Sequence, residues 1–187
     1  MDQRPTRLDY FETPAGKTDC AWQVDAFARF ATLSVPCALQ LGVPAVSALS
    51  KTKAALKILA CDRNPMHRNA ECSLLLCEET AVPLQTESVD LVLWPHGLDR
   101  HSDNAAVLSE ITRLLTPEGL VIVTFFNRNG VWSLRQKFSL GPTIFPDDIY
   151  PCTVTCAKEQ LTRAGLTVQG GAFGVYGINH KAGALEK

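Results

Sequence analysis

The chain has 187 residues, of which 46% are hydrophobic and 20% are charged, and its 18 basic and 19 acidic side chains leave a net charge of −1. This length and composition are typical of one soluble globular domain. They exclude a membrane protein, because no apolar run approaches the roughly 18 residues of a spanning helix, and they argue against a nucleic-acid-binding protein, which usually carries a basic surplus.

The N-terminal region consists of a polar start followed by a helical pattern. Residues 1–7 carry no apolar segment that could act as a secretory signal, so we expect a cytoplasmic protein. Apolar side chains at three- and four-residue spacing predict an amphipathic helix over residues 17–33. We interpret residues 1–35 as a helical leader packed on the domain formed by residues 36–187, within a chain that is a single domain overall.

Short apolar runs then alternate with helical patterns along the rest of the chain. The apolar runs predict strands at residues 37–42, 55–62, 72–77, 89–94 and 120–126. Helical spacing predicts helices at residues 45–53, 103–115, 131–138 and 155–164. This alternation indicates right-handed βαβ crossovers and an α/β fold, with a mainly parallel sheet in the order 3-2-1-4-5. The residues of the strand at 120–126 are all apolar or β-branched, and we expect this strand to be covered on both faces.

The C-terminal region is interpreted as one further strand. Residues 166–176 have strand-like character, with a bend or bulge expected at Gly170 and Gly171. The chain then offers too few residues for a second antiparallel strand, so we predict a truncated sheet. Its open edge would suit a homodimer.

The seven cysteines are an odd number in a chain expected to lie in a reducing compartment, so we expect reduced thiols. Cys152 and Cys156 have the spacing of half a structural zinc site but lack a second pair. We therefore predict no metal site, and we interpret the cysteines as small buried residues.

One stretch of about forty residues carries a family resemblance. The strand around Asp90-Leu91-Val92 leads to a loop with His96, and residues 108–115 read L-x-E-x-x-R-L-L before Pro117-Glu118-Gly119. The stretch resembles the second half of a class I S-adenosylmethionine-dependent methyltransferase domain of the small-molecule type. Residues 10–16 resemble the leader of a bacterial subgroup. The resemblance implies a three-layer Rossmann-like fold, S-adenosylmethionine as cofactor and an unidentified small-molecule acceptor.

In such folds the ligand lies at the carboxyl ends of the strands, and the resemblance implies roles for residues at these ends. Asp62, in a segment similar to the family's D-x-S-P-x-M, would accept the ribose hydroxyls, although an acid there could equally form a turn or cap a helix. Glu78 or the backbone N–H of Glu79 would contact the adenine, the alternative being two solvated loop acids. Trp94 and Pro95 would line the pocket wall.

His96 is the catalytic candidate. The resemblance places it near the transferred methyl group or the acceptor, whereas a local hydrogen bond to backbone would make it purely structural. A general base is needed only if the acceptor must lose a proton before it attacks. His96 and His101 are the first candidates for that task.

The first strand end departs from the family pattern D/E-x-G-x-G-x-G. Gln40 stands where the acid usually pairs with the ammonium group of the cofactor, Leu41 and Gly42 follow, and Pro44 removes a backbone donor. We assign Gln40, Leu41 and Gly42 to the methionine end of the cofactor. Loss of a buried charge-assisted bond would cost about 1.5–3 kcal/mol, so we expect a dissociation constant weaker than about 10 μM, or no binding.

Two functions from different classes follow. The first is a methyltransferase, and the alternative is a catalytically inactive methyltransferase-like binding or scaffolding protein, which the altered first loop favours. A nicotinamide-dependent Rossmann protein is disfavoured because G-x-G-x-x-G is missing.

Overall fold

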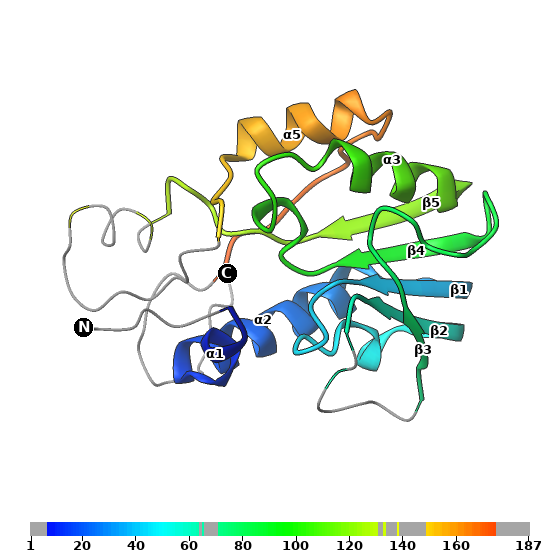
Figure 1. Ribbon diagram of the computed structural model, residues 1–187, viewed down its shortest axis with the longest axis horizontal. Helices are drawn as coiled ribbons and strands as arrows, with labels where there is room; N and C mark the ends of the chain where they lie inside the picture. The colour runs from blue at the N-terminus through cyan, green and yellow to red at the C-terminus, as the bar shows by residue number, and fades with distance from the viewer. Residues whose placement is uncertain are drawn as a thin grey trace.

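The computed structural model describes residues 7–63, 65, 71–130, 133, 138 and 149–174. Its centre is a five-stranded sheet in the order β3-β2-β1-β4-β5, in which each neighbouring pair of strands is parallel (Figure 1). The strands are β1 (Ser34–Leu41), β2 (Lys53–Cys61), β3 (Ser73–Leu76), β4 (Val89–Trp94) and β5 (Leu115–Val123). The predicted fold class and strand order are therefore confirmed.

Helices cover both faces of the sheet. On one face lie α1 (Arg7–Glu12), α2 (Pro14–Phe30) and the short 3-10 helix η1 (Ala48–Lys51), and on the other lie α3 (Ala105–Leu114) and α5 (Val154–Arg163) (Figure 1). Successive side chains of a strand point to opposite faces, so Ala38 packs in the core beneath α2 whereas Leu39 and Leu41 pack in the core beneath α3 and α5. Among the described residues, none of the helices has the length and apolar character needed to cross a membrane.

The strand register brings the carboxyl ends of the strands together. In β1, Gln40 lies beside Leu59 of β2 and Leu93 of β4. The last residue of β4, Trp94, lies beside Val123 of β5. The loops that follow the strands therefore share one edge of the sheet, which is where a parallel sheet of this type binds ligands.

The strand β5 differs from its predicted form in two ways. It begins directly after α3, at Leu115, and reaches Val123 through a register irregularity opposite Val89, so the predicted turn at residues 116–119 is part of the strand. From Leu120 onward its residues are half-buried rather than covered on both faces. The reason is its position: β5 is the edge strand.

The predicted C-terminal strand is not formed over residues 166–174, which carry no strand assignment. Three glycines in this segment offer no side chains to pack. The backbone at Gly174 lies instead against the indole of Trp22 on α2, so closely that a Cβ on Gly174 would overlap the ring. Residues 175–176 of that prediction, and most of the predicted helix at residues 131–138, lie outside the described residues.

Candidate functional site

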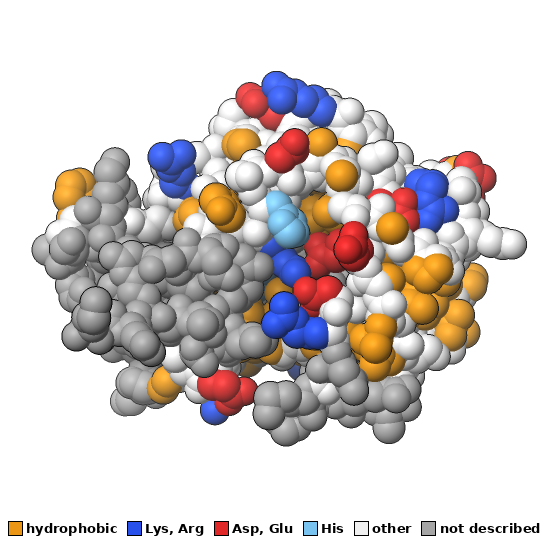
Figure 2. Space-filling view, viewed as in Figure 1, with side chains coloured by type: hydrophobic (Ala, Val, Ile, Leu, Met, Phe, Trp, Pro, Cys, Tyr) orange, Lys and Arg blue, Asp and Glu red, His pale blue; other side chains and the backbone are white. Residues whose placement is uncertain are grey.

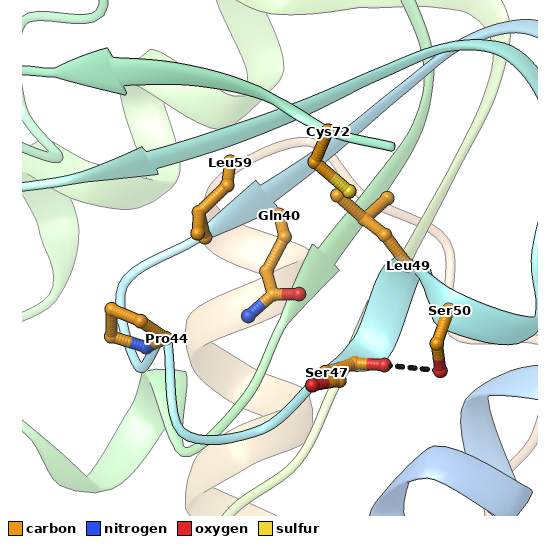
Figure 3. A pocket seen from close by; sticks show the side chains of 7 residues that line it. All are labelled: Gln40, Pro44, Ser47, Leu49, Ser50, Leu59 and Cys72. Carbon is orange, nitrogen blue, oxygen red and sulfur yellow. Dashed lines mark hydrogen bonds between the residues drawn. The ribbon is translucent and has the colours of Figure 1, made fainter. Parts of the chain in front are cut away.

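The loop after β1 is held by Gln40. This side chain is only 2% exposed; its amide nitrogen donates to the carbonyl oxygens of Val43 (2.9 Å) and Val46 (2.6 Å), and its amide oxygen accepts from the N–H of Ala48 (3.0 Å). Figure 3 shows the amide pointing into the loop between Pro44 and Ser47. Both amide donors and the amide oxygen of Gln40 are therefore used within the loop and by the first residue of η1.

The small cavity beside Gln40 is a feature of this loop and not a ligand site. It measures about 30 Å³, which is room for one or two water molecules. Its walls come from the β1 loop, η1, β2 and the start of β3, through Gln40, Pro44, Ser47, Leu49, Ser50, Leu59 and Cys72 (Figure 3).

An ion pair covers Gly42, the glycine that follows β1. Gly42 has φ +77°, which glycine adopts readily, and its N–H donates to the carbonyl of Ala60 at 3.0 Å. Above it, Nη1 of Arg100 pairs with Oε1 of Glu79, and their side chains are only 15% and 8% exposed. A Cβ on Gly42 would overlap the guanidinium and lie 2.6 Å from Oε1 of Glu79. The side-chain pair therefore occupies the space directly over this backbone position.

Trp94 completes this group. Its indole N–H faces the second carboxylate oxygen of Glu79 at 3.4 Å, and its ring is fully buried. The structure thus brings together three predicted site residues, Gly42, Glu79 and Trp94, with Arg100, which sequence reasoning missed. Leu41 is buried in the core and Pro95 is buried after β4.

Two further predicted acids face solvent at the same edge. Asp62 follows β2 with its side chain 51% exposed and a 3.4 Å contact to the guanidinium of Arg63. Glu78 follows β3 and is also exposed. In the view of Figure 2, acidic and basic side chains lie beside a histidine near the middle of the visible face. Both carboxylates are open to a ligand that approaches from solvent.

His96 lies in a different, fully enclosed cluster. Its Nε2 is 2.9 Å from Oδ2 of Asp19 and 2.6 Å from the amide nitrogen of Gln23, and its Nδ1 is 3.2 Å from Oδ2 of Asp99. Thr124 ties the cluster to the end of β5, because its hydroxyl donates to Gln23 (2.6 Å) and accepts from the N–H of His96 (2.9 Å). Both ring nitrogens are therefore engaged by buried side chains.

The charge of His96 is set by these neighbours. Burial lowers the pKa of the imidazole, but the carboxylates of Asp99 and Asp19 outweigh it and raise the pKa from 6.5 to about 10. The two carboxylates therefore favour the charged, imidazolium form of the ring. A general base must be able to accept a proton, and a raised pKa disfavours the neutral imidazole that this role needs.

Aromatic rings enclose the imidazolium. The ring centroids of Phe126 and Phe11 lie 4.4 Å and 5.5 Å from that of His96, and Tyr10 packs edge-on against both phenylalanines. Tyr10 and Phe11 belong to α1, which lies within the expected helical leader but before the helix predicted over residues 17–33. The sequence does contain a signal for the rest of the cluster: Asp19 and Gln23 stand four residues apart and so share one face of the predicted helix.

Comparisons with known proteins show which protein family this chain resembles. Residues 39–123 match the family of methyltransferase domains. No curated protein sequence matches the chain.

Solved structures give the fold. A Haloferax volcanii protein solved in complex with the methyltransferase activator Trm112 is 17% identical, with a TM-score of 0.63 over 86% of this chain and 76% of its own. A Thermotoga maritima S-adenosylmethionine-dependent methyltransferase is 20% identical, with a TM-score of 0.60 over 83% and 79% of the two chains.

A Haemonchus contortus phosphoethanolamine N-methyltransferase, solved with S-adenosyl-L-methionine, is 15% identical, with a TM-score of 0.57 over 78% of this chain and 36% of its own. The family match runs from the end of β1 to the end of β5 and includes Gly42, Glu79 and Arg100. Residues 39–123 therefore match a methyltransferase domain, and these solved structures share the fold of this chain.

Proposed function

We propose that this protein is an S-adenosylmethionine-dependent methyltransferase for a small-molecule acceptor, and that it holds the adenosine half of the cofactor through Asp62 and Glu78. The observation that carries this proposal is the exposed carboxylate of Asp62 at the end of β2, one strand away from Gly42. A carboxylate there can accept both ribose hydroxyls, and hydrogen bonds to a charged acceptor are worth about 1.5–3 kcal/mol. Glu78 is exposed after the neighbouring β3, and we assign it to the adenine edge.

The methionine half of the cofactor does not fit the side chains as they stand. The amide of Gln40 makes its hydrogen bonds within the loop, and the Arg100–Glu79 pair covers Gly42. At the end of β1 the methionine end would therefore meet a covered Gly42 and an amide at residue 40 in place of a carboxylate. This supports weak binding, with a dissociation constant above about 10 μM.

The chain's own contribution to methyl transfer is positioning. When bound, the cofactor supplies an already activated methyl group, so holding the acceptor in line at about 3–3.5 Å provides most of the acceleration. His96 is held as an imidazolium between two carboxylates, and we assign it to anchoring α2 and the end of β5 rather than to proton transfer. His101 lies exposed in the loop after β4.

Calorimetry with S-adenosylhomocysteine tests the proposal. We expect Asp62→Asn to weaken binding at least tenfold, because the neutral amide loses the charge-assisted acceptor of the ribose. Asp25→Asn is the matched control: Asp25 is an exposed acid on α2, paired with Lys51, and its variant keeps the wild-type affinity. Equal affinities of the Asp62→Asn variant and the wild type would reject the ribose role.

One observation favours the second candidate, a non-catalytic module that keeps the fold as a binding or scaffolding protein. The ion pair over Gly42 fills the position that glycine leaves open for a ligand. This candidate predicts that neither S-adenosylhomocysteine nor adenosine binds at millimolar concentration. Saturable binding of either ligand would exclude it.

We also propose that the open edge of β5 binds a second copy of the chain. Among the described residues no strand pairs with the outer side of β5. Unpaired backbone groups along a strand edge are a template for pairing with another chain. We propose the cytoplasm as the place where this protein works, because its balanced charge and its free cysteines suit a reducing compartment.

A further inference from the structure

The Arg100–Glu79 pair is a buried ion pair over Gly42, whose φ is +77°. Glu79 comes from the loop after β3 and Arg100 from the end of the 3-10 helix η2 (Gly97–Asp99), which follows β4. The two side chains meet above Gly42 from neighbouring loops and are 8% and 15% exposed. Trp94 fixes Glu79 from below through its indole N–H.

The pair has the charge pattern of an amino acid. A guanidinium and a carboxylate side by side present one positive and one negative group, as do the ammonium and carboxylate at the methionine end of the cofactor. They lie over the backbone that this end of the cofactor would approach in a class I methyltransferase. A buried pair keeps its place because either charge, left without the other, pays a large desolvation penalty.

We propose that the Arg100–Glu79 pair closes the methionine subsite, so that the adenosine half of a ligand binds at Asp62 while its amino-acid end is excluded. This inference rests on the proposed cofactor site. It requires that the amino-acid end of a ligand adds nothing to the affinity of the ligand for the wild type. It also requires that removal of the pair opens the space over Gly42.

Two probes separate the halves of the ligand. S-adenosylhomocysteine carries the amino-acid end, and 5′-methylthioadenosine has the same adenosine and thioether but lacks that end. In calorimetry we expect the wild type to bind both with dissociation constants within threefold of each other. In Arg100→Met we expect S-adenosylhomocysteine to bind at least tenfold tighter than in the wild type, with the affinity for 5′-methylthioadenosine unchanged.

A second variant is included in case Arg100→Met does not fold. Arg100→Met leaves Glu79 buried without its cation, so the double variant Arg100→Met/Glu79→Gln removes both charges, and the amide oxygen that replaces the carboxylate can still accept from Trp94. Thermal unfolding shows which of the two is folded. The double variant Lys51→Met/Asp25→Asn is the control, because it removes an exposed ion pair on α2 and η1, and it keeps the wild-type ratio of affinities.

The outcomes separate this inference from the proposed function. If the wild type binds S-adenosylhomocysteine ten times more tightly than 5′-methylthioadenosine, the pair does not exclude the amino-acid end, although the cofactor site stands. Weaker binding of S-adenosylhomocysteine in the folded variants also overturns the inference, since Arg100 would then be a ligand contact. Absence of binding by either probe to every folded variant overturns the inference and the proposed cofactor site together.

Discussion

Gln40 shows how a residue that looks like a degenerate ligand contact can be a structural one. An acid at its position would pair with a cofactor ammonium, but the loop after β1 turns two carbonyl oxygens, those of Val43 and Val46, toward this side chain. Only an amide can donate to both and still accept from Ala48. The glutamine therefore suits this loop, and the loss of the family acid is linked to the loop conformation.

Gln40→Glu is expected to destabilise the protein by about 2–4 kcal/mol, because a buried carboxylate would face two carbonyl oxygens without a donor. The free energy of unfolding from urea titration measures this. Gln85→Glu makes the same chemical change at an exposed position, and we expect a change below about 0.5 kcal/mol there. Similar free energies for the two variants would contradict the assigned role of Gln40.

His96 predicts a specific pH dependence of stability. Its pKa is about 10 in the folded protein against 6.5 as the ordinary value, so the folded state binds the proton more tightly than the unfolded state. The stabilising contribution is complete below pH 6.5, decreases as the pH rises above that value, and is lost once the pH passes about 10.

Urea titrations between about pH 7 and pH 10 measure this effect. We expect the wild type to lose stability over this interval, and His101→Gln, at an exposed histidine, to lose it in parallel. His96→Gln leaves Asp19 and Asp99 buried without the cation and is expected to cost about 3–5 kcal/mol at neutral pH. A His96→Gln variant as stable as the wild type at neutral pH would show that the cluster is not an ion triad.

At the scale of elements, the corner between α1 and α2 positions the aromatic cover of His96. Thr13 begins α2 by accepting from the N–H of Gly16 at 3.0 Å, and its hydroxyl donates to the carbonyl of Tyr10 at 2.6 Å. The chain packs so tightly at this corner that a Cβ on Gly16 would lie 2.7 Å from Cα of Phe11. The two short contacts hold α1 over the end of the sheet.

Gly16→Ala is therefore expected to destabilise the protein by about 1–3 kcal/mol, although alanine is intrinsically the better helix residue by about 1 kcal/mol. Thr162→Ala, at an exposed position of α5, is the control and is expected to be neutral or slightly stabilising. Thermal unfolding measures both. An increase in stability for Gly16→Ala would show that α1 does not pack at this corner.

At the scale of the whole molecule, the proposed dimer depends on the outer edge of β5, with which no described strand pairs. The N–H of Thr124 donates to Trp94 of β4, and N–H groups of alternate residues point the same way in a parallel strand. Ile122 thus faces β4, whereas Val121 and Val123 turn their N–H groups to the open edge.

We expect light scattering to give twice the mass of one chain. Hydrogen exchange provides an internal control: the amides of Val121 and Val123 exchange more slowly as the protein concentration rises, and the amide of Ile122 does not respond. A monomer at all concentrations, with unchanged exchange at Val121 and Val123, would show that no second copy binds this edge.

Local pattern was sufficient for the parallel sheet. Hydrophobic runs and helical spacing are properties of neighbouring residues, so they predicted the five strands and their order, and the motif around Glu110 and Arg113 indicated the methyltransferase domain. The predicted C-terminal strand was wrong over residues 166–174, because the three glycines in this segment have no side chains to pack against a neighbouring strand.

Which side chains at the strand ends are buried and paired was decided only by the tertiary structure. Asp19 and His96 are 77 positions apart, and Arg100 reaches Glu79 from a different loop, so no local pattern could pair them. The sequence by itself determined which residues stand at the carboxyl ends of the strands. Contacts between distant elements decide whether each of these residues faces solvent, as Asp62 does, or is paired with a buried partner. Burial and pairing in turn set the charge of a side chain and its availability to a ligand.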